Sequence, residues 1–490
     1  MQRIFHITEL LFILVVFAYF MLTGCTKQAD DGKIKISTVS ESAKEDFLKG
    51  RDLFEKLRAR ESLQYFESAL SKDNKFAMAY YYHSLANPTT KGFFEDLENA
   101  MINSEKISEG EQLFIKALKA GVEGNQQLQE QYLTKLLEEY PSDERAHFQA
   151  GQFYFGLQKF ELAVEHLKRC IEINPKYSNA YNMLGYSYRN MENYPDAEKA
   201  FKEYIKQIPD DPNPYDSYAE MLSKVGRYDE SIEQYKKALA INPSFFNSYM
   251  GISNDLIYLD KYQEAVENSR NAYQIAKNDG ERRFALFTNT VAYVDAGKIE
   301  DALTEMDKQL EIAKNNNDPG AMNGDLNLMG NILFEAGRYD ESKIRFDEAL
   351  KVIENSGLSE EVKENNRRLN LYNLGRVALM NGNLEEASKL AKDFLDKSTS
   401  VNNVFQIWLA NSLNGMIAVK NKDYKKAISD FEKSNLQNPQ TLYYLAEAYL
   451  SDGNKIEAKK YAQKCAEFNP LLNLNQSFVR NKAKEMLKTI

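Results

Sequence analysis

Small, aromatic and proline residues recur along the middle of the chain with a fixed step of 34 positions. Gly151 and Gly185 are one step apart, and Ala219 follows after another. Three further classes of position keep the same step: aromatic Phe160, Tyr194, Tyr228 and Tyr262; small Ala163, Ala197, Ser231 and Ala265; and Pro175, Pro209 and Pro243. Four classes with one period indicate an array of repeated units, each burying its apolar face against its neighbours.

Each class of position has a physical reason within a pair of helices. The small residues predict that the two helices cross closely, because larger side chains would clash there. The aromatic residues are expected to begin the second helix, and the prolines to end it, since proline lacks a backbone donor. The pattern resembles the tetratricopeptide repeat (TPR), a helix–turn–helix unit. The resemblance implies an all-α fold, a tandem TPR solenoid coiled into a right-handed superhelix.

The repeats differ in length and regularity along the chain. Residues 144–177, 178–211 and 212–245 fit the pattern best, whereas residues 85–143 fit it poorly. Between residues 283 and 405 the repeats lengthen to about 40 residues, which predicts longer second helices. The expected organisation is an N-terminal array over 43–279, a C-terminal array over 280–470, and a capping helix over 471–490 with Phe478, Ala483 and Leu487 as its apolar residues.

The chain opens with an apolar run from Leu10 to Leu22 that follows the basic residue Arg3. The run ends in Leu22-Thr23-Gly24-Cys25, which resembles the lipobox of a bacterial lipoprotein signal peptide. The resemblance implies that residues 1–24 are removed, that Cys25 is acylated, and that residues 25–42 form a flexible tether. An uncleaved membrane anchor is the less favoured interpretation, because the run is shorter than the ~20 apolar residues of a spanning helix.

The lipobox implies a location in the cell envelope. Thr26, directly after the cysteine, favours the outer membrane over retention in the inner membrane. We expect the protein to face the periplasm and to contact the membrane through its lipid anchor only. Asp30-Asp31 resembles the acidic export tag of some Bacteroidetes surface lipoproteins, which leaves surface exposure open, although a solvated acidic tether is the simpler interpretation.

Composition and motifs narrow the function classes. The formal net charge of −10 argues against a nucleic-acid partner, because such binders need a basic surface. The sequence contains no phosphate-binding glycine-rich loop and no hydrolase or metalloprotease motif. Cys170 and Cys465 take a slot that holds alanine in other repeats, so packing explains them better than redox chemistry. We therefore expect no enzymatic activity, no cofactor and no metal site.

The remaining candidate for function is a groove. In a TPR array the first helices line the concave face, and this resemblance implies that polar side chains of the strongest repeats form it. The candidate peptide-binding residues are Arg145, Phe148, Gln152, Asn179, Asn182, Tyr186, Arg189, Asn213, Asp216, Glu220, Asn247 and Asn254.

Three of these asparagines, Asn179, Asn213 and Asn247, again lie 34 residues apart. A row of amides can bind the backbone of an extended peptide, because each amide is both donor and acceptor. Helix capping is the alternative and the simpler interpretation, since Asn213-Pro214 has the form of a cap followed by a first-turn proline.

Two function classes remain open. The first is a non-catalytic, membrane-anchored scaffold that binds a protein or peptide partner in the concave groove. The second is a helical glycan-capture or uptake-accessory lipoprotein of the outer membrane. Sugars usually stack on exposed tryptophan, and Trp408 is the only tryptophan, so the first class is favoured.

Replacing the lipobox cysteine tests the proposed processing. We expect Cys25→Ser to accumulate an unprocessed precursor and to abolish acylation, because the thiol is the acceptor of the lipid. Metabolic labelling with a fatty acid, followed by electrophoresis of both forms, measures this. A wild-type protein that takes up no label would contradict the lipoprotein interpretation.

Overall fold

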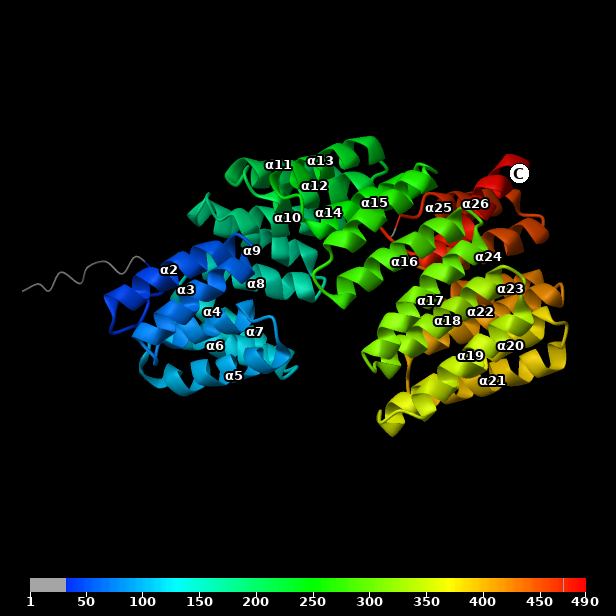
Figure 1. Ribbon diagram of the computed structural model, residues 1–490, viewed down its shortest axis with the longest axis horizontal. Helices are drawn as coiled ribbons and strands as arrows, with labels where there is room; N and C mark the ends of the chain where they lie inside the picture. Colours follow the sequence, from blue (N-terminus) through cyan, green and yellow to red (C-terminus); the bar gives the residue numbers. More distant parts are fainter. Residues whose placement is uncertain (1–31, 470) are drawn as a thin grey trace, which may run out of the picture. The chain divides into compact units, whose positions relative to one another are not determined.

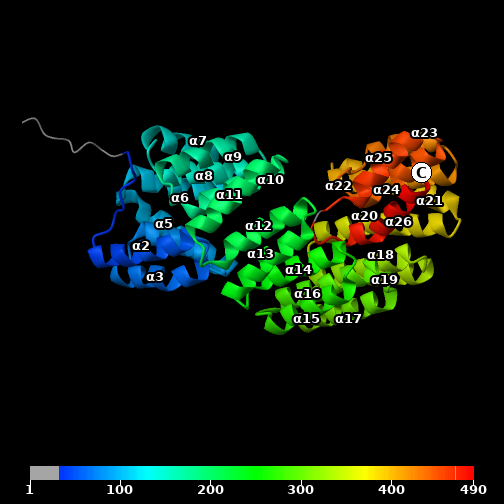
Figure 2. The same ribbon diagram turned by 90° about the horizontal axis from the view of Figure 1, so that it is seen from above.

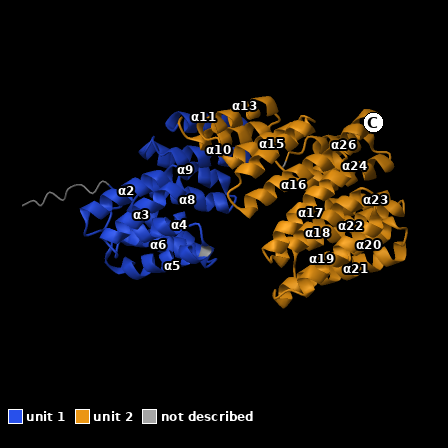
Figure 3. Cartoon of the chain, in the orientation of Figure 1, with its two compact units in different colours: residues 1–208 blue, residues 209–490 orange. Residues whose placement is uncertain are grey.

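The computed structural model describes residues 32–469 and 471–490, and over these residues it contains 25 α-helices, one short 3-10 helix and no strand. The expected signal peptide, Cys25 and the first part of the tether lie outside the described residues. Among the helices that are described, none combines the length and apolar character needed to span a membrane. The chain forms two compact units, residues 1–208 and residues 209–490 (Figure 3).

The first unit consists of five helix pairs that follow one another along the chain (Figure 1). Its helices are α2 (Glu41–Glu55), α3 (Ala59–Lys72), α4 (Ala77–Ala86), α5 (Thr90–Ile102), the 3-10 helix η1 (Asn103–Lys106), α6 (Glu109–Val122), α7 (Gln126–Glu139), α8 (Glu144–Gly156), α9 (Phe160–Ile173), α10 (Ser178–Asn190) and α11 (Tyr194–Gln207). The region 85–143, which fits the repeat pattern poorly, therefore still folds into helix pairs.

The second unit continues the pairing and ends in a single helix. Its helices are α12 (Pro212–Lys224), α13 (Tyr228–Ile241), α14 (Phe246–Tyr258), α15 (Tyr262–Ile275), α16 (Asp279–Asp295), α17 (Ile299–Asn315), α18 (Pro319–Glu335), α19 (Tyr339–Glu354), α20 (Glu360–Met380), α21 (Leu384–Ser400), α22 (Val404–Lys420), α23 (Tyr424–Glu432), α24 (Pro439–Ser451), α25 (Lys455–Ala466) and α26 (Leu474–Thr489).

Several glycines of the first helices face a large side chain of the partner helix. A Cβ added at Gly185 in α10 would lie 2.7 Å from the ring of Phe201 in α11. The same contact recurs at Gly415, where an added Cβ would lie 2.6 Å from the ring of Phe431. The predicted close crossing is therefore confirmed, and the space that glycine leaves is filled by a side chain.

The other periodic positions also lie where the pattern predicts. Phe160, Tyr194, Tyr228 and Tyr262 are the first residues of α9, α11, α13 and α15. The helices α9, α11 and α13 each end two residues before the periodic proline, as expected from the missing backbone donor of proline.

Two expectations about the organisation differ from the structure. The boundary between the units follows Ile208, not Asp279, because Met250, Ala272 and Ala285 form one packed cluster across the expected boundary. The longer repeats do lie beyond residue 278, but their first helices lengthen as well as their second ones. α16, α17 and α18 each have 17 residues, whereas α12 has 13.

Two carboxyl–hydroxyl pairs join the first helices α12 and α14. Ser248 Oγ donates to Asp216 Oδ1 over 2.7 Å, and Ser223 Oγ donates to Asp255 Oδ1 over 2.5 Å. All four side chains are buried. Burial raises the pKa of each aspartate to about 7, although the serine hydrogen bonds oppose this shift. Both carboxyls are therefore largely protonated in the folded protein in mildly acidic solution.

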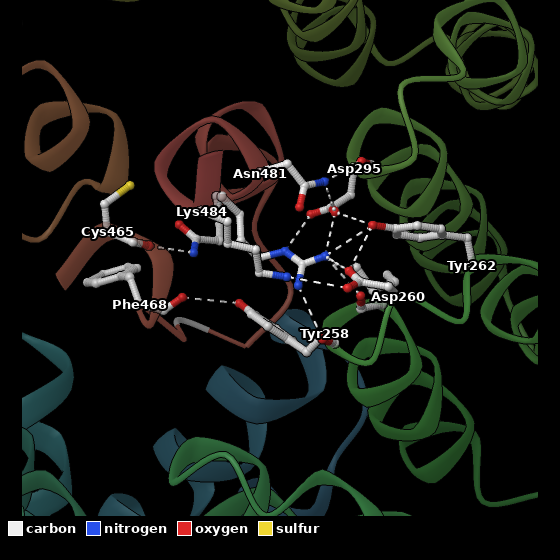
Figure 4. A network of polar contacts seen from close by, with 11 residues as sticks. Tyr258, Asp260, Tyr262, Asp295, Cys465, Phe468, Asn481 and Lys484 are labelled. Carbon is white, nitrogen blue, oxygen red and sulfur yellow. Dashed lines mark hydrogen bonds and ion pairs between the residues drawn. The ribbon is translucent and has the colours of Figure 1, made fainter. Parts of the chain in front are cut away.

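The last helix, α26, does more than cover the final repeat. It packs against α24 and α25, and also against α16, which lies almost 200 residues earlier in the chain. Arg480 carries this contact: its side chain is 1% exposed and forms an ion pair with Asp295 over 2.6 Å. Figure 4 shows that the guanidinium also reaches Asp260 and the backbone of Tyr258. The capping helix is thus amphipathic as expected, with Lys482, Glu485 and Lys488 exposed, but its buried face also carries a charge.

We expect Ala197→Leu to lower the free energy of unfolding by about 1–3 kcal/mol through overpacking. Ala197 is fully buried in α11, and its class recurs in every strong repeat. Lys199→Leu, on an exposed position of the same helix, is the matched control and should change stability by less than about 0.5 kcal/mol. Urea denaturation measures both variants, and equal midpoints would show that the helices do not meet at Ala197.

The two buried aspartates predict that stability falls as the pH rises. Their folded-state pKa values lie above the unfolded value, so the stabilisation is complete below about pH 4 and is lost as the pH passes 7. Between pH 5 and pH 7 the free energy of unfolding should fall by on the order of 2–3 kcal/mol for each carboxyl.

Urea unfolding at pH 5 and pH 8 measures this, with the double variant Asp216→Asn and Asp255→Asn as the comparison. The variant removes both titrations and keeps the shape of the side chains. We expect its stability to vary less with pH than that of the wild type. An unchanged pH dependence would assign the effect to other groups.

Candidate functional site

A cavity of about 370 Å³ opens on the first helices of the first unit. Side chains of α2, α4, α6, α8 and α10 line it, with two more from α7. The first-unit cavity is defined by Phe54, Glu55, Leu57, Tyr81, Tyr82, Leu85, Phe114, Ala117, Leu118, Gln129, Leu133, Arg145, Phe148, Gln149, Gln152, Phe153, Tyr177 and Asn179.

Aromatic rings make up much of the cavity wall. Tyr82 lies edge-on to Phe54 with ring centroids 5.5 Å apart, and edge-on to Tyr81 at 5.2 Å. Elsewhere in the lining, Phe148 packs against Tyr177 with ring centroids 4.9 Å apart. Burial raises the pKa of Tyr81, Tyr82 and Tyr177, so their hydroxyls stay neutral hydrogen-bonding groups. The wall suits a partly apolar ligand.

The charges in the cavity compensate one another. Arg145 in α8 donates two hydrogen bonds to Glu55 in α2, Nε to Oε1 over 2.5 Å and one terminal nitrogen to Oε2 over 3.0 Å. Its other terminal nitrogen donates to Glu144 over 2.7 Å. Bidentate pairs of this kind are strong and directional. Arg145, predicted as a groove residue, therefore lies in the cavity but serves mainly to fix α8 against α2.

Amide groups supply the polar contacts that remain open. Gln149 donates to the hydroxyl of Tyr81, while its buried carbonyl oxygen has no hydrogen-bond partner among the described residues. The side chains of Asn179 and Gln152 also line the cavity, and the described part of the chain gives neither a hydrogen bond. The amides of Asn179 and Gln152 can therefore both donate to and accept from a ligand, as the backbone of a peptide requires.

The first unit already holds one stretch of chain across its helices. Residues 33–39, which form neither helix nor strand, lead into α2 (Figure 2). Carboxylates of the repeats accept the backbone N–H groups of this segment: Ile34 donates to Asp143 over 3.0 Å, and Ser37 donates to Glu111 over 2.9 Å. The expected flexible tether over residues 25–42 is therefore wrong for residues 33–39.

The segment also contributes to a second cavity of about 390 Å³. Ile34 and Ile36 face Tyr82, Arg145 and Glu111 there. Gly110 leaves the space for Ile34, since an added Cβ would lie 2.6 Å from its side chain.

The structure brings together four of the predicted groove residues in the first unit. Arg145, Phe148, Gln152 and Asn179 all line the first-unit cavity. The other three, in α10, do not line it. Asn182 is buried with a carbonyl oxygen that has no hydrogen-bond partner within the described chain, and Tyr186 packs edge-on against Phe201, with the Arg189 guanidinium 4.6 Å above its ring.

The remaining predicted residues belong to the second unit. Asp216 and Asn254 are buried, and Asn254 donates to Ser223 over 3.4 Å, so both serve the contact between α12 and α14. Glu220 is half-buried and Asn247 is exposed. Asn213 accepts a hydrogen bond from Ser217 within its own helix over 3.2 Å.

Helix capping by the three periodic asparagines is wrong. α12 begins at Pro212, and Asp211 is its cap, with its carboxylate accepting from the backbone N–H of Asn213 over 2.9 Å. Asn179 and Asn247 likewise take the second position of α10 and α14. The shift of one or two residues arises because the helices start earlier than the Asn-Pro pattern indicates.

Sequence reasoning missed most of the first-unit cavity. Phe54 and Tyr82 come from repeats that fit the 34-residue pattern weakly. The repeat register therefore did not predict them as groove residues. The available signal was the aromatic run Tyr80-Tyr81-Tyr82 in a segment that has the form of a first helix. Nothing in the sequence around Glu55 indicates its role, because that role depends on a contact with Arg145, which is 90 residues further along the chain.

The comparisons with known proteins concern the repeats. Two models described as tetratricopeptide repeat match the chain, one at residues 144–177, 213–245 and 439–470 and one at residues 166–199. Among solved structures, a crystal structure of MamA protein is 20% identical with a TM-score of 0.31, covering 34% of this chain and 91% of its own. The crystal structure of YrrB, "a TPR protein with an unusual peptide-binding site", is 18% identical with a TM-score of 0.29, covering 37% and 91%.

A search of curated proteins gives no significant match. The matched segments coincide with helix pairs α8–α9, α12–α13 and α24–α25, whose glycine, alanine and aromatic positions recur in the other pairs. The described chain is therefore an all-helical array of tandem TPR-type repeats.

Proposed function

We propose that the protein is a non-catalytic scaffold of the bacterial cell envelope that binds a peptide segment of a partner protein in the first-unit cavity. The observation that carries the proposal is the way the first unit holds residues 33–39. Side-chain carboxylates accept backbone N–H groups of this segment, and two isoleucines line the adjoining cavity. The surface thus binds chain through its backbone, which is what a peptide partner requires.

The first-unit cavity lies next to this segment, sharing Tyr82, Phe114 and Arg145 with the second cavity. It has aromatic walls and amide groups with open hydrogen-bonding capacity, and its arginine is neutralised by two glutamates. A ligand for this lining needs backbone-like donors and apolar side chains, and gains nothing from a net charge. An uncharged, partly apolar peptide segment meets these requirements.

The lipid anchor belongs to the same proposal. If Cys25 is acylated, as the lipobox implies, the residues between it and Lys33 span at most roughly 30 Å when extended. Lys33 is held against α8 by an ion pair with Glu144 over 2.9 Å. The first unit would then sit close to the membrane, which suits a partner that is itself in the envelope. We propose the outer membrane, facing the periplasm.

Glycan capture remains the second candidate, and a different observation favours it. Trp408 lines a separate cavity in the second unit together with amide and hydroxyl groups. This candidate concerns that cavity alone.

Peptide binding through the first-unit cavity predicts the effect of removing two amides. A peptide enriched from a random display library on the purified chain should bind the variant Gln152→Ala with Asn179→Ala about tenfold more weakly. Two lost hydrogen bonds of ordinary strength account for that factor. Fluorescence polarisation of the labelled peptide measures the affinity.

The matched control is Asn247→Ala, which removes an exposed amide of α14 in the second unit. It should bind the peptide with the affinity of the wild type. All variants should have the same melting temperature as the wild type. Equal affinity of the double variant and the wild type would contradict the proposal. If the double variant does bind more weakly, a photo-crosslinking residue at position 152 in intact cells would identify the natural partner.

A further inference from the structure

A third cavity, of about 170 Å³, lies on the first helices of the second unit. Side chains from α20, α22 and α24, and from the loop before α24, line it. Its lining includes Arg376, Tyr372, Trp408, Phe405, Ser412 and Thr441. No predicted groove residue belongs to it, and it is independent of the peptide site proposed for the first unit.

Arg376 is the unusual feature of this cavity, because it is a buried cation without a counter-charge. It is only 5% exposed. Its guanidinium carbon lies 4.3 Å from the ring centre of Phe334 and 4.9 Å from that of Tyr372. One terminal nitrogen donates to Asn331 Oδ1 over 2.6 Å, while the buried Nε–H has no acceptor in the described residues.

Buried arginines are normally paired with carboxylates, since an unpaired buried charge is costly. Over residues 32–469 and 471–490, no carboxylate lies within ion-pair distance of Arg376. The nearby Glu335 is bound by Lys482 over 3.1 Å and by Gln440 over 3.0 Å. The cavity therefore lacks one negatively charged acceptor that its arginine is placed to bind.

Hydroxyl and amide groups beside Arg376 are also open. Ser412 and Thr441 are buried residues of α22 and α24, and the described chain gives their hydroxyls no hydrogen-bond partner. Asn435 uses its carbonyl oxygen to accept from the backbone of Gln437 over 2.9 Å, which leaves its N–H donors for a ligand. A ligand with several hydroxyl groups would match this set.

An exposed aromatic pair borders the same cavity. Phe405 is 73% exposed, and its ring stands nearly perpendicular to that of Trp408, with centroids 5.4 Å apart. Both residues line the cavity. An exposed aromatic pair beside a pocket is a contiguous apolar surface of the kind that marks binding sites, and the ring faces suit the C–H surface of a sugar ring.

We propose that this cavity binds an acidic sugar residue of a glycan. The carboxylate of the sugar accepts from the terminal nitrogen of Arg376 that does not bind Asn331, its ring hydroxyls bond to Ser412, Thr441 and Asn435, and its C–H face lies against Trp408 and Phe405. A hexuronic acid carries all three features in one ring. An extended peptide is the poorer occupant, because the cavity has room for one ring-sized group and not for a length of chain.

The test is calorimetric titration of the full-length chain, purified in detergent, with a trisaccharide of galacturonic acid. The neutral galactose trisaccharide is the matched ligand. We expect the acidic trisaccharide to bind at least tenfold more tightly than the neutral one. Arg376→Gln should abolish that difference, whereas Trp408→Ala should weaken the acidic ligand about tenfold. Phe94→Ala, an exposed aromatic residue of the first unit, is the control and should change nothing.

Phe405→Ala keeps the test valid if Arg376→Gln fails to fold, because Phe405 is exposed and lies outside the core. It should also weaken the acidic trisaccharide several-fold. Equal binding of the two trisaccharides, or binding of neither, would overturn the proposal. Tighter binding of a peptide with a free C-terminal carboxylate, lost in Arg376→Gln, would also overturn the assignment to a sugar. Each result is independent of peptide binding in the first-unit cavity.

Discussion

The close approach of two helices at a glycine or alanine shapes the regular repeats. At Gly185 and Gly415 the space of the missing Cβ is taken by a phenylalanine of the partner helix. This contact fixes the distance between the helices and orients the aromatic ring toward the core. Because one pair buries only part of its apolar surface, the rest must be covered by the next pair. The first helices are thereby lined up with one face free, and both candidate cavities lie on such faces.

The two units use that free face in different ways. In the first unit, backbone groups of residues 33–39 bind carboxylates at the ends of the helices, and the cavity beside them keeps open amides. In the second unit, α26 returns to α16, and Arg480 is buried against Asp295. A buried ion pair adds little net stability over an apolar contact, but it makes any other placement of the helix costly. The pair therefore specifies where the C-terminal helix lies.

The sequence was sufficient for the parts of the fold that depend on local packing. The 34-residue step located the small, aromatic and proline positions, and the structure places them at helix crossings, helix starts and helix ends. It was insufficient for contacts between distant segments. Neither the pair of Arg145 with Glu55 nor the pair of Arg480 with Asp295 has a local signal, because 90 and 185 residues separate the partners. The same limit explains why the tether and the unit boundary were wrong.

The candidate site was predictable only where the repeats are regular. Four residues of α8 and α10 were placed in the groove from their register, and they line the first-unit cavity. The aromatic wall from α2 and α4 was missed, since those repeats depart from the period that defines the register. Capping by Asn179, Asn213 and Asn247 failed for a different reason, because the start of a helix shifts by one or two residues without a change in the repeat.

The packing of the repeats determines most side chains but does not indicate a ligand. The chemistry of a ligand is therefore inferred from polar groups that the packing leaves without hydrogen-bond or ion-pair partners. Such groups line two cavities: the amides of Gln152 and Asn179 in the first unit and the guanidinium of Arg376 in the second. The amides need a partner that both donates and accepts, and the guanidinium needs an anion. A single ligand class does not satisfy both, because an N–H-rich peptide supplies the first and a carboxylate supplies the second. The two units therefore differ in the chemistry of their ligands although they share one repeat.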